Sequence, residues 1–372
     1  MPPVSPATVS AANAATANVS RSQVRSSFNL VFILLLLAMP LLMVELYVGF
    51  QAGDDKSYLA GALGWANSFP YVGTDHWTLR HTITIPTAAF LKLFGFHEFA
   101  VSLTNSLYFI LFVVTNAWFI RRFLAAGSAA VTILLIITLP GFIVLSTFLD
   151  IGIPEILFLS LAFWSYRLAL DMPEKVRLWV VSGVMLGLAF ITRETAASMV
   201  LFIGLMFLFK PIVSRLRYLY LFGAAAAMLV LDWTYLTLTT GNPLYRFTLD
   251  LNHDKVDRFA NVAGVAARGG LIDREGNISI NVFLDPFLNL FISQKYTLLF
   301  WLLVPALIHL WRRRLQGGVA LTLNLLAGFA LLSFVFLGAN PKLYLVPRYF
   351  LVTAWAAAII VGWWLVARVD VA

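Results

Sequence analysis

Cysteine is absent from the sequence, and charged residues are scarce. Without cysteine the chain can form no disulfide and offers no thiolate as a nucleophile or metal ligand. Asp, Glu, Lys and Arg make up only 12% of the 372 residues, about half the share in soluble domains, whereas 60% of the residues are apolar. A folded chain of this length could not keep so much apolar surface away from water. The sequence therefore predicts a protein that folds in a lipid bilayer.

Apolar runs of suitable length recur along the chain. A helix crosses the hydrocarbon core with about 20 apolar residues. Ten runs of that size or slightly shorter lie near residues 28–50, 99–120, 127–148, 153–170, 177–192, 196–210, 217–239, 296–311, 318–338 and 349–367. We therefore expect an all-α, polytopic integral membrane protein with about ten transmembrane helices. Residues 1–27 are expected to form a disordered cytoplasmic tail, and residues 28–372 a single transmembrane domain.

The basic residues predict the orientation of these helices. They gather in short connectors, which are Arg121-Arg122, residues 167–177, residues 210–217, residues 312–314 and Arg368. By the positive-inside rule these connectors and both termini face the cytoplasm, and the polar stretches 51–97 and 241–295 are outer loops. The basic residues form no stripe and no nucleic-acid-binding motif, so no nucleic-acid partner is expected. Because acidic residues hardly influence topology, their concentration in the outer loops and spans indicates chemistry on the outer face.

The first outer loop carries an acidic pair, Asp54-Asp55, directly after the first apolar run. Apolar residues at helical spacing follow the pair over residues 58–69 and again over residues 82–94, which predicts two amphipathic helices lying in the membrane interface. Helix capping and catalysis both account for such a pair. His81 lies between the two helices, near other polar residues, but no metal-ligand spacing is present.

Four further positions place charge where the membrane makes it costly. Asp150 and Glu155 flank Pro154, where an acid either complements a helix N-terminus or serves a function. Arg193 interrupts an apolar stretch, and either pairs with its neighbour Glu194, reaches the interface, or meets a lipid-linked phosphate. Arg348, at the outer start of the last run, either reaches the interface or meets a lipid-linked phosphate.

The order of these features resembles the polyprenyl-phosphate-sugar-dependent glycosyltransferases of the GT-C class, of the protein O-mannosyltransferase and aminoarabinose transferase type (family 39-like). The resemblance rests on the acidic pair and on the segments FLKLFGFHEFAVSLTNSLYFILF, FLDIGIPEILFLSLAFWSYRLAL, GLAFITRETAASMVLF and, more weakly, VPRYFLVTAWAAAII. It covers residues 28–210 well. The chain departs from the family in the first loop, where Arg80-His81-Thr82-Ile83 stands in place of a His-Pro-Pro-like segment.

The resemblance implies a membrane enzyme that moves a sugar from an undecaprenyl- or dolichyl-phosphate donor to a hydroxyl of an acceptor protein, lipid or glycan. The reaction would occur on the non-cytoplasmic face with inversion, in the cell envelope and inner (plasma) membrane of a bacterium. The expected roles are catalytic base for Asp54 or Asp55, sugar or acceptor binding for Asp150, Glu155 and His81, and phosphate binding for Arg193 and Arg348. No cofactor is expected, and the sequence leaves open whether a divalent metal takes part.

A transporter or flippase of a lipid-linked or polar solute is the alternative. Asp232 lies within the seventh apolar run, and an acid inside the membrane is either held by a neighbouring helix or lies on a transport path. Such a protein would need an opening to each side of the membrane.

Overall fold

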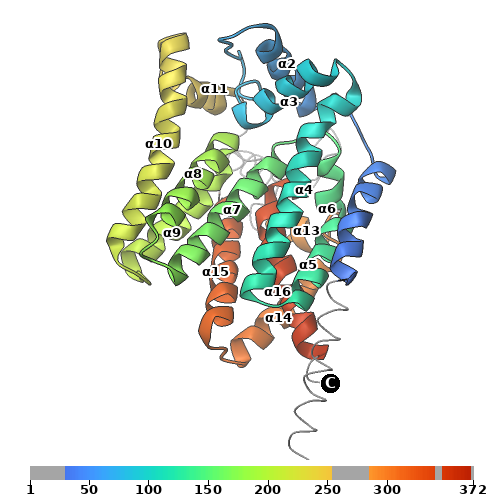
Figure 1. The fold of residues 1–372 in the computed structure, drawn as a ribbon, viewed down its shortest axis with the longest axis vertical. Helices are drawn as coiled ribbons and strands as arrows, with labels where there is room; N and C mark the ends of the chain where they lie inside the picture. Colours follow the sequence, from blue (N-terminus) through green and yellow to red (C-terminus); the bar gives the residue numbers. More distant parts are fainter. Residues whose placement is uncertain (1–29, 254–284, 340–345, 370–372) are drawn as a thin grey trace, which may run out of the picture.

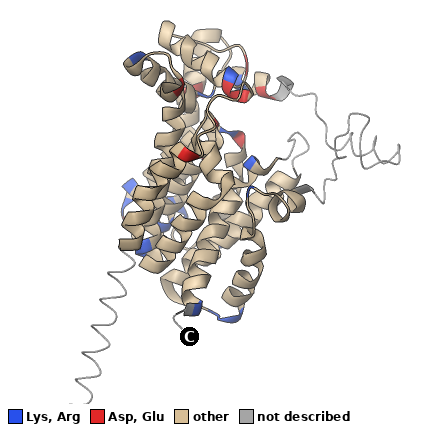
Figure 2. Ribbon diagram, turned by 90° about the vertical axis from the view of Figure 1, so that its right-hand side faces the viewer, with Lys and Arg blue, Asp and Glu red and all other residues tan. Residues whose placement is uncertain are grey.

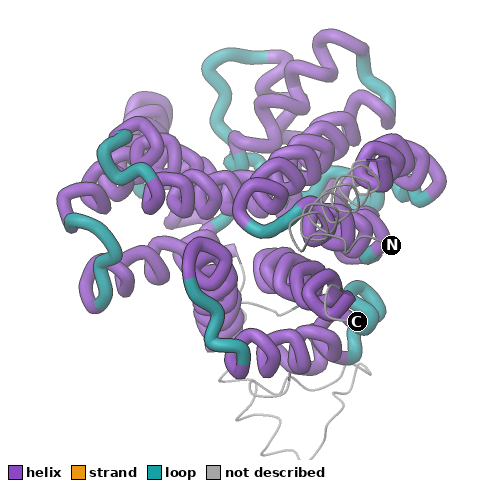
Figure 3. The backbone as a smooth tube through the Cα atoms, turned by 60° about the horizontal axis from the view of Figure 1, so that its bottom comes forward, coloured by secondary structure: helices purple, strands orange, loops and turns teal. Residues whose placement is uncertain are grey.

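The computed structural model describes residues 30–253, 285–339 and 346–369, and in these ranges the secondary structure is helical throughout, without strands (Figure 3). The predicted all-α class is therefore confirmed. The predicted tail, residues 1–27, lies outside the described residues, as does most of the second outer loop. A first helix, Leu30–Glu45, precedes those labelled in Figure 1, which are α2 (Asp54–Asn67), α3 (His81–Phe94), α4 (Glu98–Phe123), α5 (Ala126–Thr138), α6 (Pro140–Ile143), η1 (Val144–Ser146), α7 (Gly152–Asp171), α8 (Val176–Thr192), η2 (Glu194–Ala196), α9 (Ala197–Phe209), α10 (Arg215–Thr240), α11 (Tyr245–His253), α13 (Asp285–Phe291), α14 (Leu299–Arg312), α15 (Gly317–Ala339), η3 (Pro347–Phe350) and α16 (Leu351–Val369).

All ten predicted apolar runs coincide with apolar helices, and the protein is a multi-pass membrane protein. Among the described residues, five helices are long and apolar enough to cross a bilayer alone: α4, α7, α10, α15 and η3 with α16. A sixth span results if α5 is joined to α6 and η1 across a bend of 67°. The first helix, α8, η2 with α9, and α14 are apolar but shorter. The positions of the runs are thus confirmed, whereas the count of ten spans is not.

The two ends of the bundle differ in charge, as the sequence predicts. Figure 2 shows most acidic residues in the upper half and a group of basic residues at the lower end, near the C terminus. The two helices predicted in the first outer loop, α2 and α3, lie at the upper end together with α11 (Figure 1). This upper end is called the acidic end below.

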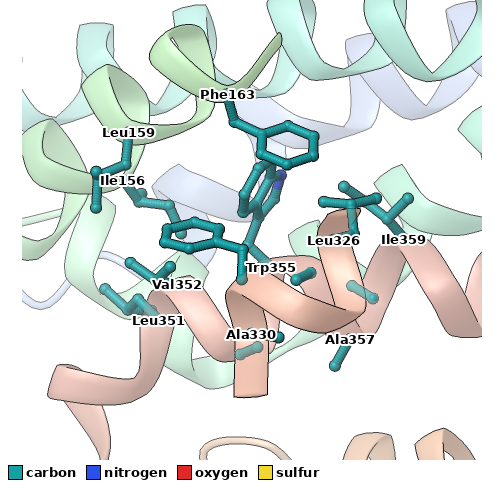
Figure 4. Packing of buried hydrophobic residues seen from close by; sticks show 14 of the residues in the cluster. Ile156, Leu159, Phe163, Leu326, Ala330, Leu351, Val352, Trp355, Ala357 and Ile359 are labelled. Carbon is teal, nitrogen blue, oxygen red and sulfur yellow. The ribbon is translucent and has the colours of Figure 1, made fainter. Parts of the chain in front are cut away.

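The centre of the bundle is held by α16 and by one buried amide. Residues 354–361 of α16 are almost entirely buried, and Trp355 packs against Phe163 of α7 (Figure 4). Asn116 of α4 accepts hydrogen bonds from the indole N–H groups of Trp164 and Trp355, each at 2.7 Å. Because buried polar groups are costly unless they are paired, this three-way contact fixes α4, α7 and α16 relative to one another.

Glycines bring α10 close to α8. A Cβ atom at Gly183 would collide with the carbonyl oxygen of Leu221, and one at Gly187 would collide with Met228. Small residues allow such close helix approach in membranes, where dispersion contacts replace the hydrophobic effect. The contact sets the position of α10, and α10 in turn places Asp232 near the acidic end.

Candidate functional site

Arg348 joins two carboxylates at the acidic end. It lies in η3, just before α16, and its Nη2 is 2.5 Å from Oδ2 of Asp54, in the first turn of α2. Its Nη1 is 3.2 Å from Oδ2 of Asp150, which precedes α7. The planar guanidinium fork suits this double contact, because its nitrogens can serve two acceptors at once. The structure therefore brings together three residues that are far apart in the sequence, with 294 positions between Asp54 and Arg348.

The two members of the acidic pair have different surroundings. Asp55 is buried and accepts hydrogen bonds from the backbone N–H groups of Gln51, at 2.5 Å, and Lys56, at 3.1 Å. Asp54 contacts Arg348, and 31% of its side chain is exposed. Asp55 thus stabilises the turn that leads into α2, whereas Asp54 presents a carboxylate to the site.

Arg193 and Glu155 form a second pair beside the first. Nη1 of Arg193 lies 3.3 Å from Oε2 of Glu155, whose other oxygen accepts a hydrogen bond from Thr195. The guanidinium carbon of Arg193 is 3.8 Å from the centre of the Tyr349 ring. Since Tyr349 follows Arg348 directly, this stacking contact places both arginines in one site. Arg193 pairs with Glu155 and not with its sequence neighbour Glu194.

Asp150 combines the two uses that its position suggests. Its Oδ1 accepts a hydrogen bond from the N–H of Gly152 at 2.6 Å, as a residue at a helix start commonly does. Its Oδ2 remains directed to Arg348. The side chain amide of Asn105 binds the carbonyl oxygen of Asp150 at 2.8 Å and so fixes the turn against α4.

We call Asp54, Asp150, Glu155, Arg193 and Arg348 the outer site. Two cations here face three carboxylates, so the five side chains together carry a net charge of −1 when all are ionised. An anionic ligand that binds the arginines would therefore compete with these carboxylates for the guanidinium groups.

His81 lies in a separate ionic cluster, which links α3, α10 and α11. Its Nδ1 is 3.3 Å from Oδ1 of Asp232, and Nη2 of Arg246 is 3.0 Å from the same oxygen. Trp65 and Tyr235 stack on each other with ring centres 5.7 Å apart, and the imidazole meets both rings edge-on, at 5.5 Å from each. Burial lowers the pKa of His81 below its ordinary value, and Arg246 adds to this effect, although the hydrogen bond to Asp232 opposes it. The folded protein therefore favours the neutral form of His81.

Arg80 forms the other half of this cluster. Its Nη1 is 2.5 Å from Oε1 of Glu194, and its Nη2 is 2.9 Å from Oδ1 of Asp250. Burial alone would lower the pKa of Arg80, but the charges of Glu194 and Asp250 raise it, so the side chain stays a cation. Nothing in the sequence alone assigns a role to Arg80, Arg246 or Asp250. The available signal was Asp232, since an acid within the membrane normally has a cationic partner.

Metal ligands are not gathered at either cluster. Among the residues with described placement, no three His, Asp or Glu side chains are arranged to hold a metal ion. The basic and acidic groups of the outer site pair with one another instead.

The fold resembles those of known membrane enzymes. Residues 85–235 match the family model described as dolichyl-phosphate-mannose-protein mannosyltransferase. ArnT from Cupriavidus metallidurans in the apo state superposes with a TM-score of 0.65 at 18% identity, and the same protein bound to undecaprenyl phosphate gives 0.65 at 16%. Both comparisons cover 91% of this chain and 60% of ArnT.

A more distant likeness joins the chain to an archaeal enzyme. The oligosaccharyltransferase AglB from Archaeoglobus fulgidus, in complex with an inhibitory peptide and a dolichol-phosphate, superposes with a TM-score of 0.52 at 14% identity, over 91% of this chain and 50% of AglB. The chain thus spans about 60% of the length of ArnT and half that of AglB. No curated protein matches its sequence. The resemblance to the GT-C glycosyltransferases that the sequence predicts is therefore confirmed, and the chain has their fold.

Proposed function

We propose that this protein is a membrane glycosyltransferase that moves a sugar from a polyprenyl-phosphate donor to an acceptor hydroxyl. The observation that carries the proposal is the contact of Arg348 with Asp54 and Asp150, beside the Arg193–Glu155 pair. Transfer from a lipid phosphate needs a base for the hydroxyl and cations for the departing phosphate, and the outer site holds both. The solved relatives in complex with undecaprenyl phosphate and dolichol-phosphate support this class of donor.

The position of the outer site suits a lipid-linked substrate. A polyprenyl phosphate holds its phosphate at the membrane surface while its chain stays in the hydrocarbon. The outer site lies at the acidic end, and basic residues gather at the opposite end. With the basic end in the cytoplasm, both termini are cytoplasmic, and transfer takes place on the outer face of a membrane that we propose to be the bacterial inner membrane.

An apolar groove beside α16 is suited to the donor's hydrocarbon chain. Its volume is about 260 Å³, and it is lined by α13, α14, α15 and α16, with Phe291, Val304, Ala327, Phe334 and Ala357 among the lining residues. The lining begins near the start of α16, at Thr353, and reaches Ile360. Arg348 lies in η3, directly before the same helix, and in this proposal a phosphate at the arginine directs its chain toward the groove.

The charges of the outer site suggest how the reaction proceeds. A donor phosphate that binds Arg348 and Arg193 displaces a carboxylate, and Asp54 is the one with room to move, because Asp150 is only 3% exposed. The released Asp54 takes the proton of the acceptor hydroxyl as the oxygen attacks the anomeric carbon. The bond from that carbon to the phosphate oxygen breaks, and the polyprenyl phosphate leaves with the electron pair. The arginines stabilise its negative charge.

The remaining groups orient the two substrates. A single displacement by the hydroxyl inverts the configuration at the anomeric carbon. Asp150 and Glu155, fixed by Arg348 and Arg193, accept hydrogen bonds from sugar hydroxyls in this scheme. His81, whose imidazole meets the stacked rings of Trp65 and Tyr235 edge-on, offers a contact for the acceptor outside the outer site.

The proposal is tested with purified protein in lipid vesicles and a panel of polyprenyl-phosphate sugars. Products are identified by mass spectrometry, and the anomeric configuration by NMR. We expect transfer from at least one donor with inversion, and loss of transfer for Asp54→Asn. The matched control, Asp171→Asn, removes a carboxylate at the end of α7 that lies away from Asp150 and Glu155, and it should retain activity. Passage of a lipid-linked solute across the vesicle membrane, without transfer by any donor, would instead indicate a flippase.

A further inference from the structure

Two adjacent residues between α8 and α9 connect the outer site to the second cluster. α8 ends at Thr192, and Arg193 has extended backbone angles, φ −159° and ψ 136°. Successive side chains on an extended backbone point to opposite sides. Arg193 accordingly contacts Glu155 and Tyr349, whereas Glu194 contacts Arg80. The direction of Arg193 therefore depends on where Glu194 is anchored.

Arg80 supplies that anchor from the first loop. It is 4% exposed, and its two terminal nitrogens bind Glu194 at 2.5 Å and Asp250 at 2.9 Å. Glu194 is 28% exposed, but moving it away would leave the buried charge of Arg80 with one carboxylate fewer, and such a loss of compensation is costly. Glu194 is thus held on the side of the backbone away from the outer site.

Arg246 fixes the backbone on the other side of Arg193. Its Nη1 donates to the carbonyl oxygen of Ile191 at 2.5 Å, and its Nη2 donates to the carbonyl oxygen of Leu79 at 2.7 Å. The last carbonyl groups of a helix have no donor within the helix, so Arg246 satisfies one at the end of α8. The same guanidinium contacts Asp232 of α10 and is 3% exposed.

We propose that Arg80 and Arg246 are positioning residues that hold Arg193 in the geometry needed to bind the donor phosphate. Arg246 fixes the chain two residues before Arg193, and Arg80 fixes the residue after it. Neither arginine contacts the phosphate in this scheme; both act through Arg193. This inference rests on the proposed function, because it assigns Arg193 to the phosphate.

A double-mutant cycle separates positioning from general stability. The dissociation constant of undecaprenyl phosphate is measured for wild type, Glu194→Gln, Arg193→Gln and the double variant, all in the same detergent. We expect Glu194→Gln to weaken binding about tenfold in the wild-type background and less than about twofold when Arg193 is already replaced. Arg246→Gln should show the same dependence on Arg193.

Arg167→Gln is the matched control. It also removes a buried arginine paired with an aspartate, Asp171, at 2.5 Å, but at the opposite end of α7 from Glu155. This variant should bind undecaprenyl phosphate as wild type does. Arg80→Lys, which keeps the charge facing Glu194, should retain more affinity than Arg80→Gln. Arg80→Gln replaces Glu194→Gln in the cycle if the Glu194→Gln protein does not fold.

The outcomes distinguish this inference from the proposed function. If wild type neither binds undecaprenyl phosphate nor transfers a sugar, the proposed function fails. If wild type binds but Glu194→Gln binds equally well, the positioning role alone is overturned. Equal losses in both Arg193 backgrounds would also overturn it, because they would show that Glu194 acts independently of Arg193.

Discussion

Replacing Arg348 by lysine removes the forked guanidinium group and keeps the positive charge. In the structure two different nitrogens of Arg348 serve two carboxylates, Asp54 at 2.5 Å and Asp150 at 3.2 Å. A lysine ammonium is a single point of charge on a flexible stem. It can stay close to one of the two carboxylates, and the other loses its partner.

The size of the effect follows from these contacts. A hydrogen bond to a charged group contributes about 1.5–3 kcal/mol. Losing one such bond to the departing phosphate corresponds to a fall of about 10- to 100-fold in kcat/KM. Leaving Asp150 unpaired costs more free energy than leaving Asp54 unpaired, because the Asp150 side chain is only 3% exposed. The variant should therefore also unfold at a lower temperature.

The assay is the initial rate of transfer at varied donor concentration, with thermal unfolding measured on the same preparation. Arg368→Lys is the control, since Arg368 lies at the opposite, exposed end of α16. We expect wild-type kcat/KM for Arg368→Lys. Wild-type kcat/KM for Arg348→Lys would refute the argument that the guanidinium fork is needed.

Three further outcomes are expected. Ala327→Trp fills part of the apolar groove and should raise the KM of a long-chain polyprenyl donor several-fold, about the effect of losing 1 kcal/mol of binding. The KM of a short-chain donor should not change. Equal effects on both donors would contradict the chain-binding role of the groove. Asn116→Leu leaves two buried indole N–H groups without their acceptor, so the free energy of unfolding should fall by about 2–6 kcal/mol. The control Val114→Ala, at an exposed position of the same helix, should change this free energy little. Equal unfolding midpoints for the two variants would contradict the stabilising role of Asn116. Because the pKa of His81 is lowered in the folded protein, the unfolded chain binds a proton more readily, and stability should fall as pH decreases below about 6.5; His81→Gln should flatten this slope, and an unchanged slope would contradict it.

Much of the fold can be predicted from the sequence, because long apolar runs are typical of membrane helices. Each apolar run corresponds to a helix, and the amphipathic spacing after Asp54 predicts α2 and α3. The basic connectors predict which end carries the acidic residues. The number of full spans could not be predicted, because a short apolar helix such as α14 and a bent pair such as α5 with α6 have the composition of a span without its length.

The partners within the site could be predicted only in part. The sequence places Asp54, Asp150 and Arg348 on one face, but their contact depends on how α2, α7 and α16 pack. It does not distinguish Asp54 from Asp55, because adjacent helical residues differ in direction and only packing decides which one faces the site. The pairing of Arg193 with Glu155 instead of Glu194 likewise depends on the extended backbone between α8 and α9.

The role of Asp54 as base is tested most directly by measuring donor binding and transfer together for Asp54→Asn. The amide keeps the shape of the carboxylate, cannot take a proton, and no longer competes with phosphate for Arg348. We predict that transfer falls by about 10²- to 10⁴-fold, while undecaprenyl phosphate binds at least as tightly as to wild type. Full transfer by the folded Asp54→Asn protein would contradict the account.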